Sequence, residues 1–375
     1  MATGWPMKTT YANGDVYSAA DVNDITGTIN LLGSSVAYTA GKNKIINGDF
    51  NINQRNFSST TTDGTYGFDR WVLAYSGGTC TYSTQAFTPG TAPVSGYESK
   101  SYARLVTASQ STAGHFAAVN QKIEDVRTFA GQSVTFSFWA KASTGTPNIG
   151  VALQQFFGSG GSPSAEVVTS TAVKTITSSW ARYSFTISVP SISGKTIGTT
   201  ANTSYLGAWI FTSCGTTISA LGYPAVGVQN VTIDIWGVQL EQGSTATAFQ
   251  TATGTIQGEL AACQRYYYRM QSTTAGDSFF GTGLSNSTTG ASILVTFPVT
   301  MRIRPTALEQ TGTAADYRIR QATTTTACSA VPTYDSAENF TAFVNMTVAS
   351  GLTAGQAIVG RSANTSSYLG WSAEL

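Results

Sequence analysis

The amino-acid sequence predicts an all-β protein, and three observations lead to that prediction. Charged residues make up only 10% of the 375 residues, glycines number 38, and runs of Ser, Thr and Gly separate short stretches in which apolar and polar residues alternate. Alternation with a period of two is the pattern of a strand with one buried face, and frequent turn residues indicate many short strands rather than a helical enzyme. The chain is long enough for two or three domains with their own cores.

Residues 1–42 are predicted to form an attachment arm and a short helix. The arm, residues 1–17, is turn-rich and mostly polar, and Ser18-Ala-Ala-Asp21 is a capping box that starts the helix. Within the helix, apolar residues are spaced three, four, three and four, which is the a/d seam of a coiled coil. Isoleucine at both interior seam positions favours three strands, so we expect a homotrimer; the alternative is that the stripe packs on its own domain. The seam residues are Val22, Ile25, Ile29, Leu32 and Val36.

Residues 43–252 are predicted to form one β-sandwich. Strands are expected at 134–138, at 182–189 and at 205–211, the last apolar on both faces as a central strand should be, with loops at 158–163 and 196–203.

The clearest strand of this sandwich lies near its end. Apolar residues fall on odd positions in 231–235 and on even positions in 236–240, so the phase changes at Gly237. A glycine at such a change predicts a bulge, and we expect the strand to hand its core residues, Ile233 and Ile235 among them, from one sheet to the other.

The remaining third of the chain is predicted to be a connector and a second β domain. In the connector, 253–265, Ile256, Leu260 and Cys263 have helical spacing, continued by Tyr267, and form either a second seam between subunits or a helix packed on the sandwich. Residues 266–375 are expected to form a C-terminal β-sandwich, with strands near 293–297, 301–304, 317–320 and 340–348.

Charge and residue counts exclude several functions. The net charge of +1 and the pI of about 7.6 leave no broad field that would attract nucleic acid or an anionic membrane. No apolar run is long enough to span a bilayer or to form a signal peptide, so we expect synthesis in a cytosol. The four cysteines lack a CxxC pair and are expected to be buried free thiols. The single histidine, His115, is not accompanied by the nucleophile motif of a hydrolase. Glu124 and Asp125 are neighbours in the sequence and would point to opposite faces of a sheet, so they are a poor pair for glycoside cleavage, and no catalytic residue is assigned.

Several stretches together resemble one protein family. Ile233-Asp-Ile-Trp-Gly-Val-Gln-Leu-Glu-Gln-Gly-Ser244, with Lys44-Ile-Ile-Asn-Gly-Asp-Phe50 upstream, resembles the closing and opening strands of carbohydrate-binding-module-like jelly rolls in tailed-phage tail fibres. Inner and C-terminal stretches look like the same proteins in the same order: Gln121-Lys-Ile-Glu-Asp-Val-Arg127, Ser137-Phe-Trp-Ala-Lys141, Cys263-Gln-Arg-Tyr-Tyr267 and Tyr368-Leu-Gly-Trp-Ser-Ala-Glu-Leu375.

The resemblance implies a function as well as a fold. It implies a non-enzymatic, homotrimeric virion adhesin, assembled in the host cytoplasm, that attaches to the phage tail or baseplate by its N-terminal segment. Its ligand would be a host surface glycan such as lipopolysaccharide, with no nucleic acid bound and no membrane insertion. The alternatives are a tailspike depolymerase that cleaves the glycan and a purely structural spacer.

Two sets of candidate site residues follow. Asn47, Asp49 and Asp234 carry hard oxygen ligands, and jelly rolls like this one often hold a structural calcium near their first and last strands; the alternative is that these side chains cap turns. No other cofactor is expected.

The second set consists of aromatic residues beside polar or Gly-rich loops, where they could stack on sugars: Phe279, Phe280, Tyr317 and Tyr334. We therefore place recognition in 266–375, opposite the attachment segment, with the sandwich as the alternative. Three tryptophans beside apolar strand residues are expected in the core instead: Trp71, Trp139 and Trp236.

Overall fold

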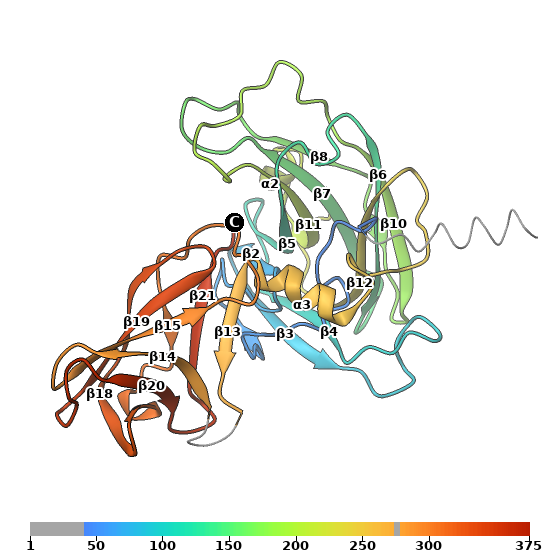
Figure 1. Ribbon diagram of the computed structural model, residues 1–375. Helices are drawn as coiled ribbons and strands as arrows, with labels where there is room; N and C mark the ends of the chain where they lie inside the picture. Colours follow the sequence, from blue (N-terminus) through green and yellow to red (C-terminus); the bar gives the residue numbers. More distant parts are fainter. Residues whose placement is uncertain (1–40, 274–277) are drawn as a thin grey trace, which may run out of the picture.

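The computed structural model describes residues 41–273 and 278–375, and it has two β bodies with one helix between them (Figure 1). One apolar core runs from Ile45 to Phe249, and a second runs from Phe280 to Ala373. The all-β class is therefore confirmed. The seam helix, with Val22, Ile25, Ile29, Leu32 and Val36, lies outside the described residues, so the trimer remains a prediction.

The first body is a β-sandwich, as expected, and all its strand pairs are antiparallel. Its last strand lies between two earlier ones, β4 and β6, which is a Greek-key connection typical of jelly rolls. One sheet has the order β1 (Ser59–Thr60), β3 (Thr79–Ala86), β4 (Ser101–Ala108), β12 (Thr232–Gln242), β6 (Ser133–Ala142), β10 (Ala181–Ser188). The other has the order β2 (Val72–Ser76), β5 (Phe116–Glu124), β11 (Tyr205–Cys214), β7 (Asn148–Phe156), β8 (Val167–Ser170), and β9 (Lys174–Thr175) also pairs with β7.

Strand β12 contains the bulge that the sequence predicts. Gly237 has a φ of 65°, and in this region two residues of β12 face one residue of β6. Ile233 and Ile235 are fully buried before the bulge, and Val238 and Leu240 are fully buried after it. The prediction that β12 contributes its core residues first to one sheet and then to the other is wrong, because β12 pairs with β6 on both sides of the bulge. The bulge instead keeps apolar residues inward along a strand that stays in one sheet.

The opening segment takes the place of β4 beside the second half of β12. Strand β4 pairs with β12 only as far as Ile235, and beyond it the Val238 amide donates to the Gly48 carbonyl at 2.8 Å. A Cβ on Gly48 would lie 2.1 Å from the Val238 carbonyl oxygen, so only glycine fits there. The turn around Asn47 is thereby fixed against the core.

The other elements expected in the sandwich are present. Strands cover 134–138, most of 182–189 and 205–211, and the last lies in the centre of its sheet, between β5 and β7. The segments 158–163 and 196–203 are loops. A short helix, α2 (Thr216–Ser219), follows β11.

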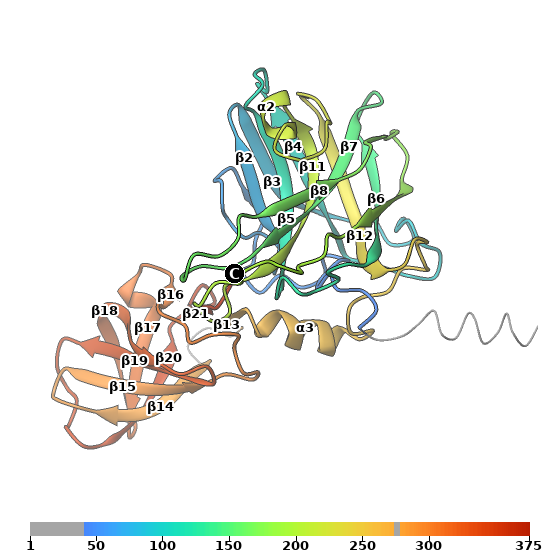
Figure 2. The same ribbon diagram turned by 90° about the horizontal axis from the view of Figure 1, so that it is seen from above.

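Helix α3 (Ile256–Gln264) follows the sandwich and lies against its end (Figure 2). The Thr255 side chain caps the helix by accepting from the Gly258 amide, and Glu259 and Cys263 are its buried residues. Of the two arrangements open from the sequence, the structure has the helix packed on the sandwich. Tyr267 is not part of it but begins the next strand.

The C-terminal body is built of β strands, but they close into a barrel and do not form the expected sandwich. The barrel order is β14 (Phe279–Ser285), β15 (Gly290–Thr296), β19 (Thr341–Val348), β18 (Thr324–Ala337), β17 (Tyr317–Gln321), β20 (Ala357–Ser362), which returns to β14. A separate sheet holds β13 (Tyr267–Gln271), β21 (Tyr368–Ser372) and β16 (Glu309–Gln310), and η1 (Ala314–Asp316) precedes β17. Closure buries one face of each strand and leaves no unpaired edge.

The segment 301–304, expected as a strand, instead joins the two bodies. The Arg302 guanidinium donates to the carbonyls of Ala373 at 2.8 Å, Glu374 at 2.7 Å and Asn202 at 2.6 Å, the last of these in the sandwich. Arg70 of the sandwich also forms an ion pair with Glu374 and stacks on the Tyr266 ring at 3.4 Å. The barrel is therefore attached to the sandwich through buried polar contacts.

Candidate functional site

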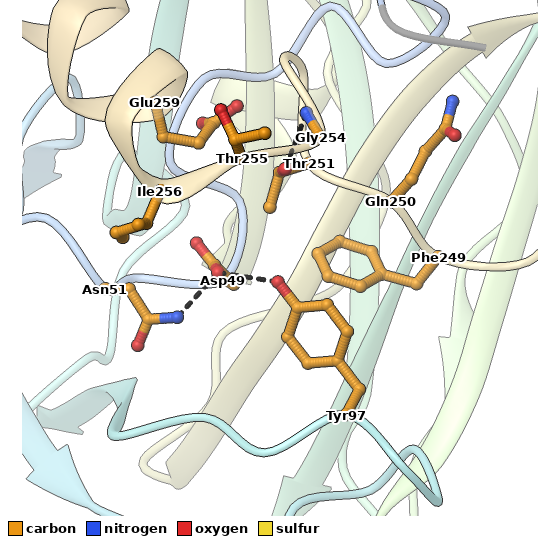
Figure 3. Close-up of a pocket in the computed structure, with 10 residues that line it drawn as sticks. All are labelled: Asp49, Asn51, Tyr97, Phe249, Gln250, Thr251, Gly254, Thr255, Ile256 and Glu259. Atoms are coloured by element: carbon orange, nitrogen blue, oxygen red, sulfur yellow. Dashed lines mark hydrogen bonds between the residues drawn. The ribbon is translucent and has the colours of Figure 1, made fainter. Parts of the chain in front are cut away.

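A cavity lies where α3 meets the sandwich (Figure 3). Its volume is about 440 Å³, and separate parts of the chain meet there: the opening turn, the loop before β4, and the segment from the end of the sandwich into α3. The lining residues are Asp49, Asn51, Tyr97, Phe249, Gln250, Thr251, Gly254, Thr255, Ile256 and Glu259.

Asp49 is the main polar group of this cavity. It is only 3% exposed, and its Oδ2 accepts from the Asn51 side-chain amide at 2.6 Å and from the Tyr97 hydroxyl at 2.9 Å (Figure 3). Its Oδ1 is buried and has no hydrogen-bond partner in the part of the chain that the structure describes. Burial raises the pKa of Asp49 above its ordinary value of 3.8, against the opposing effect of the two hydrogen bonds.

Glu259 is the second carboxylate, and both of its oxygens are occupied. Oε2 accepts from the Asn47 amide at 2.7 Å, and Oε1 accepts from the Thr253 amide at 2.7 Å and the Thr253 hydroxyl at 3.0 Å. Burial raises the pKa of Glu259, and the nearby Asp49 adds to this. Glu259 therefore ties the helix to the opening turn and leaves Asp49 as the carboxylate with a free oxygen.

The apolar wall of the cavity is supported by packed aromatic rings. The Tyr97 ring meets those of Phe249 and Trp236 edge to face, with centroids 5.4 and 5.6 Å apart. Phe249 is almost fully buried, whereas Tyr97 is half-buried and Ile256 on α3 is 53% exposed. Apolar surface that a ligand can cover is thus provided by Tyr97 and Ile256.

The three residues predicted to hold calcium do not come together. The Asp234 carboxylate pairs with Arg104, at 2.6 and 2.9 Å, and with Lys141 at 3.7 Å. The Asn47 side chain accepts from the Ile52 amide and donates to backbone carbonyls, which is the turn-capping alternative. Asp49 alone reaches the cavity. Within residues 41–273 and 278–375, no three His, Cys, Asp or Glu side chains are grouped so that they could hold a metal.

Two of the four predicted receptor-contact residues are buried, which corrects that prediction. Phe280 is 2% exposed and Tyr317 is fully buried, because both point into the barrel core. Tyr334 packs against the same core, and its hydroxyl donates to the Pro305 carbonyl. Phe279 faces outward with 59% of its surface exposed and borders a separate groove of about 520 Å³ on the barrel.

The cysteines, the tryptophans and the histidine discussed from the sequence do not line the cavity. The four cysteines are buried and free, as predicted, and Trp71 and Trp236 are fully buried, with Trp139 packed against the same core. The His115 Nδ1 accepts from the Ser111 amide in a loop. No helix in the described ranges has both the length and the apolar character needed to cross a membrane.

Sequence reasoning missed Tyr97, Phe249 and Glu259. Only Glu259 carried a signal, because it lies four residues before Cys263, which places both on one face of the helix, and both are buried. Tyr97 and Phe249 come from irregular segments whose meeting depends on the tertiary fold.

Comparison with known proteins gives fold likenesses at low similarity. No protein-family model and no curated protein matches the chain. Among solved structures, a CBM4 carbohydrate-binding module is 17% identical over 52% of this chain and 98% of its own, with a TM-score of 0.29.

Two further solved structures are similar to the same extent. A xylan-binding domain from CBM 22 is 14% identical over 50% of this chain and 96% of its own, with a TM-score of 0.30. A family 11 carbohydrate-binding module from Clostridium thermocellum, in complex with a β-1,3-1,4-mixed-linked tetrasaccharide, is 11% identical over 51% and 99%, with a TM-score of 0.28. At these TM-scores the likenesses assign no ligand to this chain.

Proposed function

We propose that this protein is a non-enzymatic, glycan-binding adhesin and that the cavity beside α3 is a saccharide site. The observation that carries the proposal is Asp49, which lines the cavity and whose buried Oδ1 has no hydrogen-bond partner among the described residues. A buried acceptor left unsatisfied costs about 1–3 kcal/mol, and a ligand hydroxyl that donates to it would recover that cost.

The rest of the cavity suits a sugar. Hydroxyl and amide groups of Asn51, Thr251 and Thr255 line it, next to the apolar surfaces of Tyr97 and Ile256. A sugar ring has hydroxyls around its edge and an apolar face, and it needs both kinds of wall. The volume of about 440 Å³ lies within the range of small-molecule sites.

The place of the protein in a virion is the finer part of the proposal. The stretches that resemble tail-fibre jelly rolls support a homotrimer that attaches to a phage tail or baseplate through residues 1–42 and binds a host glycan such as lipopolysaccharide. In such a protein three copies of a weak site would bind a cell surface far more tightly than one, by about 10² to 10⁴. Blocking of phage adsorption by the isolated protein separates this role from that of a structural spacer.

The test of the cavity is glycan binding by full-length protein. An array of bacterial surface saccharides identifies the best-bound glycan, and titration calorimetry then compares wild type with Asp49→Asn. We expect roughly 10- to 150-fold weaker binding, since one hydrogen bond to a charged group is worth about 1.5–3 kcal/mol. The control is Glu98→Gln, an exposed carboxylate in the same loop as Tyr97. Unchanged affinity in Asp49→Asn would remove the cavity from the proposal.

Depolymerase activity is the second candidate, because Asp49 and Glu259 are two carboxylates with raised pKa in one cavity. The geometry favours binding, since Glu259 is 1% exposed and both its oxygens accept backbone amides. A reducing-end assay on the bound glycan decides between the two. Release of reducing ends that is lost in Glu259→Gln would show that the protein is a depolymerase. Glycan binding without release of reducing ends would support the adhesin.

A further inference from the structure

We infer that the outer groove of the barrel is a second binding site and that its ligand is an anionic saccharide. The groove has a volume of about 520 Å³ and crosses the outer face of β14, β20 and β17. Phe279 and Leu284 border it on β14, Val359 lies on β20, and Arg320 lies on β17. The inference rests on the proposed glycan-binding function and adds to it the charge of the ligand.

Strand register brings three arginines to this face. Phe279 is opposite Arg361, which is in turn opposite Arg318. In the next row on the same face, Val359 is opposite Arg320. Residues that face each other across neighbouring strands project to the same side of a sheet, so the arginines and the exposed Phe279 share one surface.

The positive charge of this surface is not balanced by the strands that carry it. Strands β14, β17 and β20 contain no Asp or Glu. Arg318 and Arg320 are exposed and form no ion pair with any residue that the structure describes. The acid nearest to Arg318 along the chain, Asp316, is buried and accepts from the Asn364 side chain at 2.6 Å, and Asp277, before β14, lies outside the described residues. The chain as a whole carries only +1, so this is a local charge.

The apolar part of the groove makes a saccharide the best match for this charge. Phe279 is 59% and Leu284 54% exposed, and because both border the same groove they give it an apolar surface that a ligand can cover. The Arg361 guanidinium lies 5.1 Å from the centroid of the Phe279 ring and holds that ring at the rim. An aromatic ring covers the apolar face of a sugar, while guanidinium groups bind carboxylate or phosphate through paired hydrogen bonds. A uronic acid or a sugar phosphate presents both features.

The test measures binding of three oligosaccharide probes to the full chain. The probes are a galacturonate hexamer, a pentamannose phosphate and a neutral maltohexaose, titrated at 50 and 200 mM NaCl. We expect the wild type to bind one or both anionic probes, more weakly at the higher salt, and to bind maltohexaose at least tenfold less tightly in this groove. The anionic probe that binds identifies carboxylate or phosphate as the recognised group. Binding of neither would overturn the inference.

Variants locate that binding. Arg318→Gln with Arg320→Gln should lower the affinity for the anionic probe about tenfold and make that affinity less dependent on salt, because each exposed ion pair contributes about two- to fivefold in affinity. Phe279→Ala should also lower the affinity for the anionic probe, but without changing its dependence on salt, because the ring carries no charge. The control is Arg127→Gln, an exposed arginine of the sandwich.

The two binding proposals fail in different ways. Anionic binding that survives the double arginine variant but is lost in Asp49→Asn would overturn the barrel site and leave the cavity in place. Anionic binding that survives Asp49→Asn and is lost in the arginine variant supports the barrel site, whatever the cavity binds.

Discussion

Replacing Ile235 by alanine should severely weaken the sandwich, because its neighbours on both adjacent strands are too small to fill the space. Ile235 is fully buried, and the residues opposite it on both neighbouring strands, Ala103 and Ala140, are small and fully buried as well. Truncation of a buried isoleucine costs about 2–5 kcal/mol, and the cost rises with the cavity that remains. Two alanine neighbours leave most of that cavity open. We therefore expect a loss in the upper half of the range, about 3.5–5 kcal/mol.

Urea unfolding followed by tryptophan fluorescence measures this loss. Five of the seven tryptophans, at positions 71, 139, 180, 209 and 236, lie in the sandwich, so the signal reports mainly on that body. This matters because a two-body protein need not unfold in one step. The control is Leu221→Ala at a 65% exposed site, which should change stability by less than about 0.5 kcal/mol. A loss below about 1 kcal/mol in Ile235→Ala would refute the placement of the core.

Three further predictions concern the opening turn, the buried carboxylate and the seam. Gly48→Ala places a Cβ 2.1 Å from a backbone oxygen of β12 and should destabilise the sandwich by about 3 kcal/mol, whereas Gly114→Ala, in open space, should be nearly neutral in the same urea assay. Because burial raises the pKa of Asp49 above 3.8, the folded protein holds that proton more tightly than the unfolded chain does, so the stabilisation is present at low pH and lost as pH rises through the folded pKa. Wild type should therefore lose stability relative to Asp49→Asn between about pH 4 and 7, and an equal difference at both pH values would contradict this. Ile25→Asp with Ile29→Asp should convert a trimer to a monomer in light scattering; a trimer that persists would mean that later residues hold it.

The sandwich could be predicted from the sequence because its signals are local. The phase change at Gly237 is visible in the order of apolar residues, and the structure has a bulge there. The barrel could not be told from a second sandwich, since strands of both alternate in the same way and closure depends on the pairing of β14 with β20, about 75 residues apart.

The candidate site was predictable only in part, for a related reason. Asp49 was identified as a possible calcium ligand because of its hard oxygens, with turn capping as the alternative, but its partner Tyr97 lies 48 residues away in a loop with no periodic pattern. Phe279 and Phe280 were assigned together, although neighbouring strand residues must face opposite sides, and only the structure shows which one faces out. A one-residue error of this kind exchanges a core residue for a surface residue.

The contacts of Arg302 fix how far apart the two proposed sites are. Arg302 is held in its own body by the carbonyls of Ala373 and Glu374 and donates one hydrogen bond across to Asn202 of the sandwich; this bond and the ion pair between Arg70 and Glu374 oppose a hinge between sandwich and barrel. Two sites on a rigid frame are a fixed distance apart. A polysaccharide long enough to reach both sites binds the second one at a high effective concentration once it is bound at the first, whereas a shorter polysaccharide binds only one site at a time. Selectivity for the length of the glycan chain would then be a property of the joint between the domains, separate from the selectivity of either site for sugar type.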